Sequence, residues 1–303
     1  MGVIGSSITP GAAREDGLEV VAARETTPRQ LALRRFLRHR LAVISLVVIL
    51  LMALAAALAP LIAPYHPATQ DLLNTLSSPS SSHFLGTDDL GRDIYSRLIY
   101  GARITLGIGF GAALVVFILG ILIGATAGYI GGWVDTLLMR FVDLVLSFPS
   151  LFLLLILAAY TGVNVVTIIL FIGFFGWMHL ARLVRSQFLV IREMEYVQAA
   201  RASGVGGWRM MWRHMLPNAL APVIVNVTFA VAIAMYVEAA LDFLGFGLSP
   251  DVATWGNMLA GSQQYIAVNP LLTVAPGVLL TVAILAVNFI GDGLRDALDP
   301  RGK

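Results

Sequence analysis

The chain has 303 residues, of which 58% are hydrophobic and 13% are charged. Soluble domains have about half apolar and about a quarter charged residues, so this composition excludes an ordinary soluble domain and indicates a membrane protein. The net charge of +2 gives no basis for a nucleic-acid partner. The chain has no cysteine, which excludes disulfides, thiolate metal sites and cysteine nucleophiles.

Six predominantly apolar segments predict an all-α fold with six transmembrane helices. A helix needs about 20 apolar residues to cross about 30 Å of hydrocarbon. The predicted spans are residues 41–63, 104–127, 137–160, 163–181, 219–241 and 268–291. A cleavable signal peptide has a shorter apolar core, so the first span is expected to be retained. The short linker Thr161–Gly162 predicts a tight helical hairpin between the third and fourth spans.

Basic residues indicate how these spans are oriented. Seven arginines lie in residues 1–40, six in residues 182–213, and three basic residues follow the sixth span. Cytoplasmic segments carry an excess of Arg and Lys, so these regions and both termini are expected to be cytoplasmic. Residues 1–32 are polar and lack periodicity, which predicts a flexible cytoplasmic tail. Residues 33–303 form the predicted membrane domain.

The loop of residues 64–103 is expected on the opposite, extracytoplasmic side. It carries three arginines, but an even number of crossings between the basic regions places it outside. Apolar residues recur at helical spacing from Ile94 to Ala102, which predicts a short amphipathic helix on the outer leaflet. A structural lead into the second span is favoured over a ligand site.

Residues 182–217 form the cytoplasmic loop with the clearest pattern. Good helix formers run from Glu193 to Ala202, and Gly204 allows a sharp turn after them. The small side chains of this helix suit insertion into a groove on another protein, although a hairpin that merely joins two spans fits the pattern equally. A second short helix is expected to have one apolar face, made of Trp208, Met211, Trp212 and Met215.

The loop resembles the coupling loop of the permeases of ATP-binding-cassette importers. The shared pattern is two alanines, three residues, a glycine, and later a Leu-Pro pair. In that family a glutamate precedes the alanines, whereas Gln198 stands here and keeps a hydrogen-bonding amide without the charge. The resemblance implies that an ATPase contacts Gln198, Ala199, Ala200, Gly204, Leu216 and Pro217.

Four further blocks resemble the second permease of the dipeptide and oligopeptide importer family. They are GTDDLGRDIYSRLIYGARITL from Gly86, GGWVDTLLMRFVDLVLSFPSL from Gly131, WGNML from Trp255 and GDGLRDALDPR from Gly291. The resemblance runs from about Leu33 to Arg301, and it implies the type I importer permease fold in the inner membrane.

The same resemblance implies the partners and the cargo. The expected partners are a homologous second permease in a heterodimer, two cytoplasmic ATPases that bind ATP and Mg, and an extracytoplasmic substrate-binding protein. Peptide is the favoured substrate, and members of the family that move nickel complexes or glutathione supply the alternative. Because no glycine-rich phosphate loop followed by Lys and Ser or Thr occurs in the chain, it is expected to bind no ATP itself.

Other functional classes fit less well. The histidines are scattered and no catalytic or metal-binding constellation stands out, so the chain is expected to be no enzyme and to hold no metal or cofactor. A stand-alone proton-coupled carrier usually shows internal repeats with interrupted helices. Six spans make only half of such a carrier, and the long loop of residues 182–217 would have no purpose in it.

Two acids near the outer end of the fifth span are candidate pathway residues. Glu238 and Asp242 are four residues apart on one helical face, and acids are costly where they meet lipid. One hypothesis places them at the interface, solvated or paired with Arg97 or Arg103. The other places Glu238 at the outer mouth of the path, where it attracts the amino group of a peptide.

Asp143 is a third candidate pathway residue. It lies near the start of the third predicted span, three residues after Arg140 on one helical face. The two side chains are therefore expected to form an ion pair near an interface.

Overall fold

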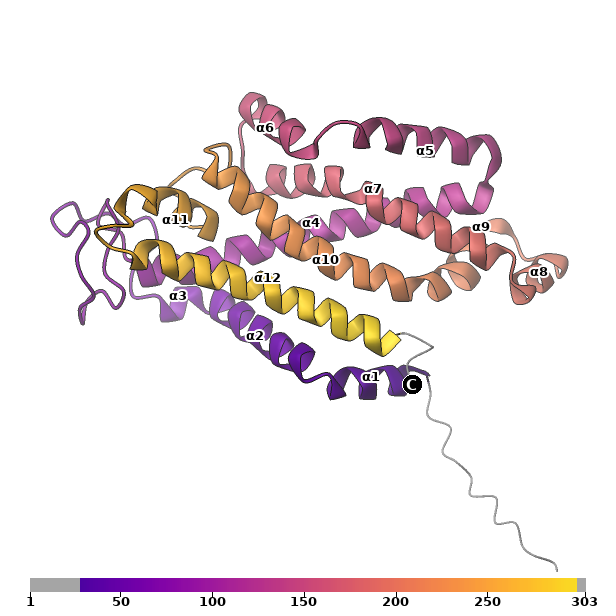
Figure 1. Cartoon of the computed structure of the whole chain (residues 1–303), viewed down its shortest axis with the longest axis horizontal. Helices are drawn as coiled ribbons and strands as arrows, with labels where there is room; N and C mark the ends of the chain where they lie inside the picture. The colour runs from indigo at the N-terminus through magenta and orange to yellow at the C-terminus, as the bar shows by residue number, and fades with distance from the viewer. Residues whose placement is uncertain (1–27, 299–303) are drawn as a thin grey trace, which may run out of the picture.

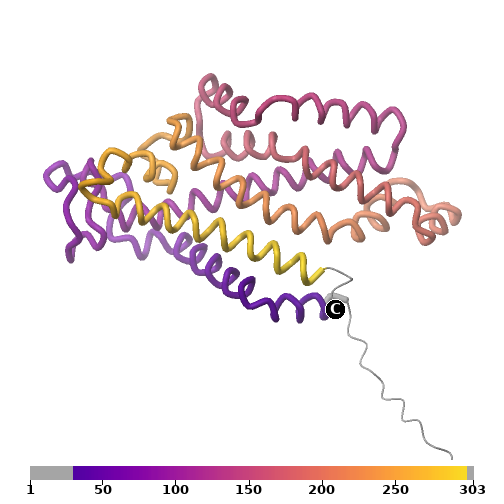
Figure 2. The backbone as a smooth tube through the Cα atoms, in the orientation of Figure 1, coloured from indigo at the N-terminus to yellow at the C-terminus, as the bar shows by residue number. Residues whose placement is uncertain are grey.

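A computed structural model describes residues 28–298 of the chain, and in that range it contains helices and loops but no β-strand (Figures 1 and 2). The predicted all-α fold class is thereby confirmed. The elements are α1 (Pro28–Arg38), α2 (Arg40–Ala57), α3 (Ala59–Ile62), α4 (Ile94–Ile130), α5 (Gly132–Leu146), α6 (Ser150–Thr161), α7 (Val165–Arg192), α8 (Glu195–Ala202), α9 (Gly207–Arg209), a π-helical turn (Met210–Met215), α10 (Leu216–Phe243), α11 (Trp255–Ser262), a 3₁₀ turn (Gln263–Tyr265) and α12 (Leu271–Leu298).

Within the described range, five helices are long and apolar enough to cross a membrane by themselves: α2, α4, α7, the continuous run from α9 through α10, and α12. The third predicted span is not one helix but the pair α5 and α6, which meet at a bend of 77°. Pro149 begins the second half of this pair, and because proline lacks an N–H and disfavours helical geometry in the residue before it, the helix ends there. The described range thus has six spans if this bent pair counts as one, as the sequence predicts, and five if it does not.

Helix α4 forms the centre of the bundle and packs along α7 and α10, while α12 lies between α10 and α2 (Figure 1). Glycines permit the closest of these contacts. A Cβ atom on Gly124 would lie 2.4 Å from the carbonyl oxygen of Ala181, and one on Gly120 would lie 2.8 Å from the side chain of Leu180. A larger residue at either position would therefore separate α4 from α7.

The predicted surface helix before the second span does not exist as a separate element. Helix α4 runs for 37 residues from Ile94 without a break. Ile94 is fully buried, and Leu98 and Ala102 are each 5% exposed. The amphipathic pattern of this segment reflects burial within the protein, where α11 and α3 cover the start of α4, rather than contact with the outer leaflet.

The two ends of the bundle differ in what they carry. The loop between α3 and α4 lies with α11 at one end, whereas α8 lies at the other, toward which α1 and the end of α12 also extend (Figure 1). His39 and Asp296 approach to 3.7 Å and join the start of α2 to the end of α12. Residues 28–32, expected in the flexible tail, belong to helix α1, and residues 1–27 lie outside the described range.

Candidate functional site

Helix α8 projects beyond the body of the bundle and is held to it by one side (Figure 1). Val197 is fully buried and packs in a cluster with Phe188 of α7 and Met210 of the π-helical turn. Side chains two residues apart on a helix point in directions about 200° apart. Ala199 therefore points away from the side that Val197 buries, and it is exposed. Burial also raises the pKa of the Tyr196 hydroxyl, which stays neutral.

The turn after α8 has the geometry that the sequence predicts. Gly204 adopts a φ of +79°, a conformation that side-chain-bearing residues rarely adopt. Its N–H donates to the carbonyl of Arg201 at 3.0 Å, and the N–H of Val205 donates to the carbonyl of Ala200 at 3.2 Å. A Cβ atom on Gly204 would meet no atom of the described chain within 4 Å. The turn therefore presents a small, open surface beside the exposed Ala199.

Gln198 and the two residues that begin α10 complete the predicted coupling set. The amide Nε2 of Gln198 donates to the carbonyl of Glu193 at 3.2 Å, which fixes the side chain across the start of α8. Leu216 is partly buried and packs against the cluster around Val197. Pro217 lies in the first turn of α10, as its missing N–H predicts. The structure thus brings the six residues of the set to one end of the bundle.

The second predicted helix of the loop differs from expectation. Residues 210–215 form a π-helical turn that continues directly into α10. Met210, Met211 and Met215 are buried in this turn, whereas Trp208 is 73% exposed. The expected apolar face is thus formed by Met211, Trp212 and Met215, of which Trp212 is partly buried against the same cluster, but Trp208 does not belong to it.

A groove runs along one face of α10, between this helix and α6 and α7. The part next to α6 and α7 encloses about 490 Å³. It is lined by residues that include Leu154, Phe175, His179, Asn226, Phe229 and Ile233. A second hollow of about 460 Å³ continues it toward the end of α12 and shares Asn226 and Phe229. No acidic residue within the described range lines either part.

Glu238, a predicted pathway residue, does not line this groove. Its side chain is fully buried, and neither carboxylate oxygen has a hydrogen-bond partner among residues 28–298. The predicted alternative, a solvated group or a pair with Arg97 or Arg103, was wrong, because the side chain is buried and unpaired within this range. Arg97 instead donates to the carbonyls of Pro67 at 3.2 Å and Pro250 at 3.3 Å.

Asp242 is likewise buried, and it fastens the loop that follows α10. One of its oxygens accepts a hydrogen bond from the N–H of Leu248 at 2.8 Å, and the other accepts from the hydroxyl of Thr254. The loop and α11 therefore fold back over the C-terminal end of α10. Both acids are therefore enclosed by protein in this structure, and neither lines the groove along α10.

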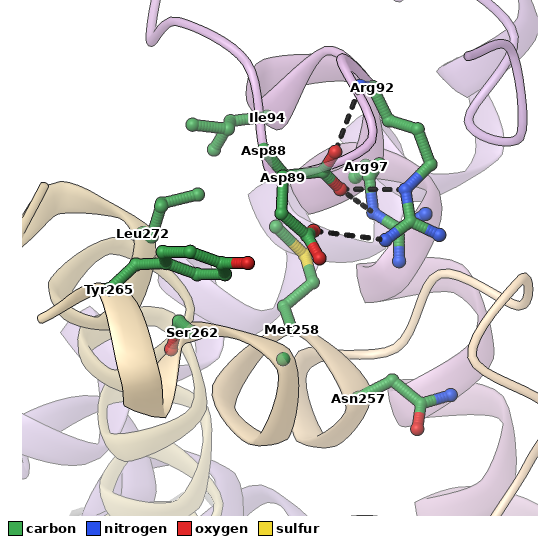
Figure 3. Close-up of a pocket in the computed structure, with 11 residues that line it drawn as sticks. Asp88, Asp89, Arg92, Ile94, Arg97, Asn257, Met258, Ser262, Tyr265 and Leu272 are labelled. Carbon is green, nitrogen blue, oxygen red and sulfur yellow. Dashed lines mark hydrogen bonds and ion pairs between the residues drawn. The ribbon is translucent and has the colours of Figure 1, made fainter. Parts of the chain in front are cut away.

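A cluster of charges lies beside α11 at the same end (Figure 3). Arg92 donates to Asp88 at 2.7 Å and approaches Asp89 to 3.9 Å, and Arg97 approaches Asp88 to 3.7 Å. The cavity that this cluster borders encloses only about 30 Å³, room for about one or two water molecules. The cluster joins the loop before α4 to the carbonyl of Pro250, in the segment that leads into α11. The cavity is too small to hold a peptide.

Asp143 forms an ion pair with Arg182 of α7 and not with Arg140, so the predicted local pair was wrong. Near it, Asp135 accepts two hydrogen bonds from Arg185, one of them 2.6 Å long. Sequence reasoning missed these partners because it assigned Arg182 and Arg185 to the cytoplasmic loop. Helix α7 in fact continues to Arg192.

Comparison with known families supports the resemblance seen in the sequence. Residues 120–303, more than half of the chain, match the family model described as binding-protein-dependent transport system inner membrane component. Residues 27–79 match the model of the N-terminal transmembrane domain of oligopeptide transport permease C. The first match covers α5 to α12, which include α8, the groove and the turn at Gly204.

Full-length relatives agree with these matches. A dipeptide transport system permease protein of Alkalihalophilus pseudofirmus is 39% identical over 91% of this chain and 91% of its own length. A putative peptide permease protein of Brucella suis is 39% identical over 98% of this chain and 99% of its own length. A putative peptide transport system permease protein of Brucella abortus is 41% identical over 91% of this chain and 93% of its own length. The chain therefore belongs to the family of binding-protein-dependent transport system inner membrane components and is a permease subunit with the type I ATP-binding-cassette importer fold.

Proposed function

We propose that this chain is a permease subunit of an ATP-driven importer of di- or oligopeptides and forms the translocation path with a homologous second permease. The observation that carries the proposal is the projecting helix α8, which presents Ala199 and the open turn at Gly204. The names of the three relatives support peptides as the substrate class. Nickel complexes and glutathione find no such support.

In this proposal α8 docks on a cytoplasmic ATPase, and two such subunits bind the ATP and Mg. Helix α8 follows α7 directly, and the π-helical turn after it is continuous with α10. Movement of the docked helix is thereby delivered to both walls of the groove as a rigid-body displacement. The basic residues at this end, among them Arg201, Arg209 and Arg213, support a cytoplasmic orientation with both termini inside.

The opposite end faces the extracytoplasmic substrate-binding protein. It is formed by α11 and by the loop between α3 and α4. The charge cluster of Asp88, Arg92 and Arg97 ties that loop to the segment that leads into α11, through the carbonyl of Pro250. A rigid platform of this kind suits the docking of a partner because little ordering is needed on contact. Residues 242–267 contain no Arg or Lys, which supports their extracytoplasmic position.

The groove along α10 is this chain's part of the path. Asn226 is exposed in the middle of α10, where contact with lipid would be costly, so it faces the path or the second permease. The groove offers the amide of Asn226 and the imidazole of His179 without an acidic group. These groups hydrogen-bond with any peptide backbone, and the lack of acidic charge suits cargo with varied side chains.

Substitution of Ala199 tests the docking of α8. Ala199→Asp places a charge on the exposed face and should abolish peptide uptake and co-purification of the ATPase, while the two permeases still assemble in the membrane. Ala199→Ser keeps the small size and should retain uptake, which makes it the matched control. Normal uptake by the Asp variant in an assembled complex would contradict the docking role.

A further inference from the structure

Helix α5 lies between two points at which the chain changes direction sharply. Gly131, with a φ of +71°, separates it from α4, and Gly132, the first residue of α5, has a φ of +58°. The 77° bend at residues 147–149 separates it from α6. Segments bounded by such points act as hinged bodies, since a few residues absorb the change in backbone angles. The position of α5 therefore depends on what holds it from the side.

Helix α5 lies alongside α7 (Figure 1) and packs on it together with Leu119 and Ile123 of α4. Val142 is the one fully buried residue of α5, and it packs in an apolar cluster with Trp177 and Met178. Phe141 stacks on Trp177 with ring centroids 6.4 Å apart. Apolar contact is non-directional, so this cluster keeps the helices together without fixing their register along one another.

Two ion pairs supply that register. Arg185 holds Asp135 through two parallel hydrogen bonds, and Arg182 holds Asp143. Bidentate arginine–carboxylate pairs contribute binding energy and also hold the two side chains in one relative orientation. The side chain of Asp135 is only 15% exposed, so loss of its partner would leave a poorly hydrated charge in a membrane protein.

The pairs lie between the coupling end and the groove. At one side, Phe188 and Ile191 near the end of α7 pack in the cluster that holds Val197 of α8. At the other side, α6 is separated from α5 by three residues, 147–149, and supplies Ser150 and Leu154 to the groove. Arg182 is one turn along α7 from His179, which also lines the groove.

We propose that the Asp135–Arg185 and Asp143–Arg182 pairs make α5 and α6 follow α7, so that movement of the coupling helix α8 changes the width of the groove. The four residues are positioning residues that act through α6 and touch no substrate. This inference rests on the proposed function, because it assumes that α8 is driven by an ATPase. Without the pairs, the hinges at both ends of α5 would absorb the movement of α7.

The test uses the whole reconstituted transporter with its ATPases and binding protein. Spin labels at Phe152→Cys on α6 and Tyr236→Cys on α10 report the separation of the two groove walls, and the chain has no native cysteine to interfere. The separation is measured without nucleotide and with ATP trapped by vanadate. Peptide uptake and ATP hydrolysis are measured on the unlabelled transporter.

In the parent protein we expect the separation to change when ATP is trapped. In Asp135→Asn with Asp143→Asn, we expect that change to disappear and uptake to fall about tenfold, the scale of a typical coupling free energy, while ATP hydrolysis persists. The reversed pairs, Asp135→Arg with Arg185→Asp and Asp143→Arg with Arg182→Asp, should restore both readouts. Arg140→Gln is the matched control, because Arg140 is an exposed cation of α5 for which the described range shows no ion pair, and it should change neither.

The outcomes separate this inference from the function on which it rests. A parent-like change in separation together with parent-like uptake in the double Asn variant would overturn the role of the pairs and leave the proposed function intact. No ATP-dependent change in the parent protein would overturn the groove as the path. If the double variant fails to assemble, Asp143→Asn alone, at the half-exposed pair, is measured in the same way, and unchanged readouts would contradict the inference.

Discussion

The indole Nε1 of Trp255 donates a hydrogen bond to the backbone carbonyl of Leu98 at 3.1 Å, which joins the start of α11 to the first turns of α4. The indole is fully buried. It lies against Gly101, where a Cβ atom would be 3.1 Å from the ring. One aromatic side chain thus locks two segments that are more than 150 residues apart in the sequence, and it stabilises the platform proposed to face the binding protein.

Truncation of Trp255 should destabilise the protein in two separable steps. Trp255→Phe removes the hydrogen bond and should cost about 1 kcal/mol of unfolding free energy. Trp255→Ala also empties the space of the ring and should cost about 3–5 kcal/mol. Thermal unfolding of the purified protein in detergent measures both. Trp133→Ala, at a 76% exposed indole of α5, is the control, and an equal loss there would contradict the assignment.

The orientation of the bundle can be tested with single cysteines. Ser81 lies in the exposed loop between α3 and α4, and Ser203 lies in the exposed turn after α8. An impermeant thiol reagent added to intact cells with a permeable outer envelope should label Ser81→Cys and leave Ser203→Cys unlabelled. Disruption of the membrane should make both react. The reverse pattern would contradict the proposed cytoplasmic position of α8.

Burial of Glu238 changes what its substitution is expected to do. Because the side chain is enclosed by protein, Glu238→Gln should affect the uptake of peptides with free and with blocked amino termini by the same factor. Competition uptake with matched peptide pairs measures the ratio of the uptake rates for free and for blocked amino termini. A loss of uptake only for peptides with free amino termini would indicate that Glu238 lines the path after all.

Asn226 should matter for passage and not for assembly. Asn226→Leu keeps the branching and the number of non-hydrogen atoms of the side chain and removes the amide from the groove, so peptide uptake should fall while binding-protein-stimulated ATP hydrolysis persists. Ile224→Ala changes an exposed residue of the same helix that lines neither hollow and should leave both unchanged. Parent-like uptake by Asn226→Leu would remove this residue from the path.

Features encoded by local pattern were predicted well from the sequence. Five of the six apolar segments correspond to single long helices because hydropathy alone requires them. The sharp turn at Gly204 and the start of α10 near Pro217 follow from the chemistry of single residues. These features need no knowledge of distant parts of the chain.

Features that depend on distant parts of the chain were not predicted. Asp143 was assigned to Arg140 because they are neighbours on one helix, whereas Arg182 is 39 residues away in sequence. The burial of Glu238 depends on a loop and a helix that fold back over α10. The surface pattern of residues 94–102 is the same for a helix that meets lipid and for one covered by protein. Only tertiary packing distinguishes these cases.

Substitutions of Gly204 can distinguish two reasons for a glycine at this position. One is its backbone conformation, and the other is close approach of a partner protein. The φ of +79° at Gly204 is unfavourable for alanine by about 1–2 kcal/mol but is tolerated by asparagine. Within the described chain, a Cβ atom at this position meets nothing within 4 Å. An asparagine side chain therefore fits the isolated permease, and any loss that it causes comes from a partner.

We expect Gly204→Asn to leave the thermal unfolding midpoint of the permease unchanged and to reduce uptake and ATPase co-purification strongly. Gly204→Ala should reduce uptake as well and should also lower the unfolding midpoint, because strain adds to the steric effect. If Gly204→Asn transported like the parent protein while Gly204→Ala did not, the glycine would serve only its own backbone conformation. The ATPase would then have to contact α8 through Ala199 and its neighbours on the exposed face, without close approach at the turn.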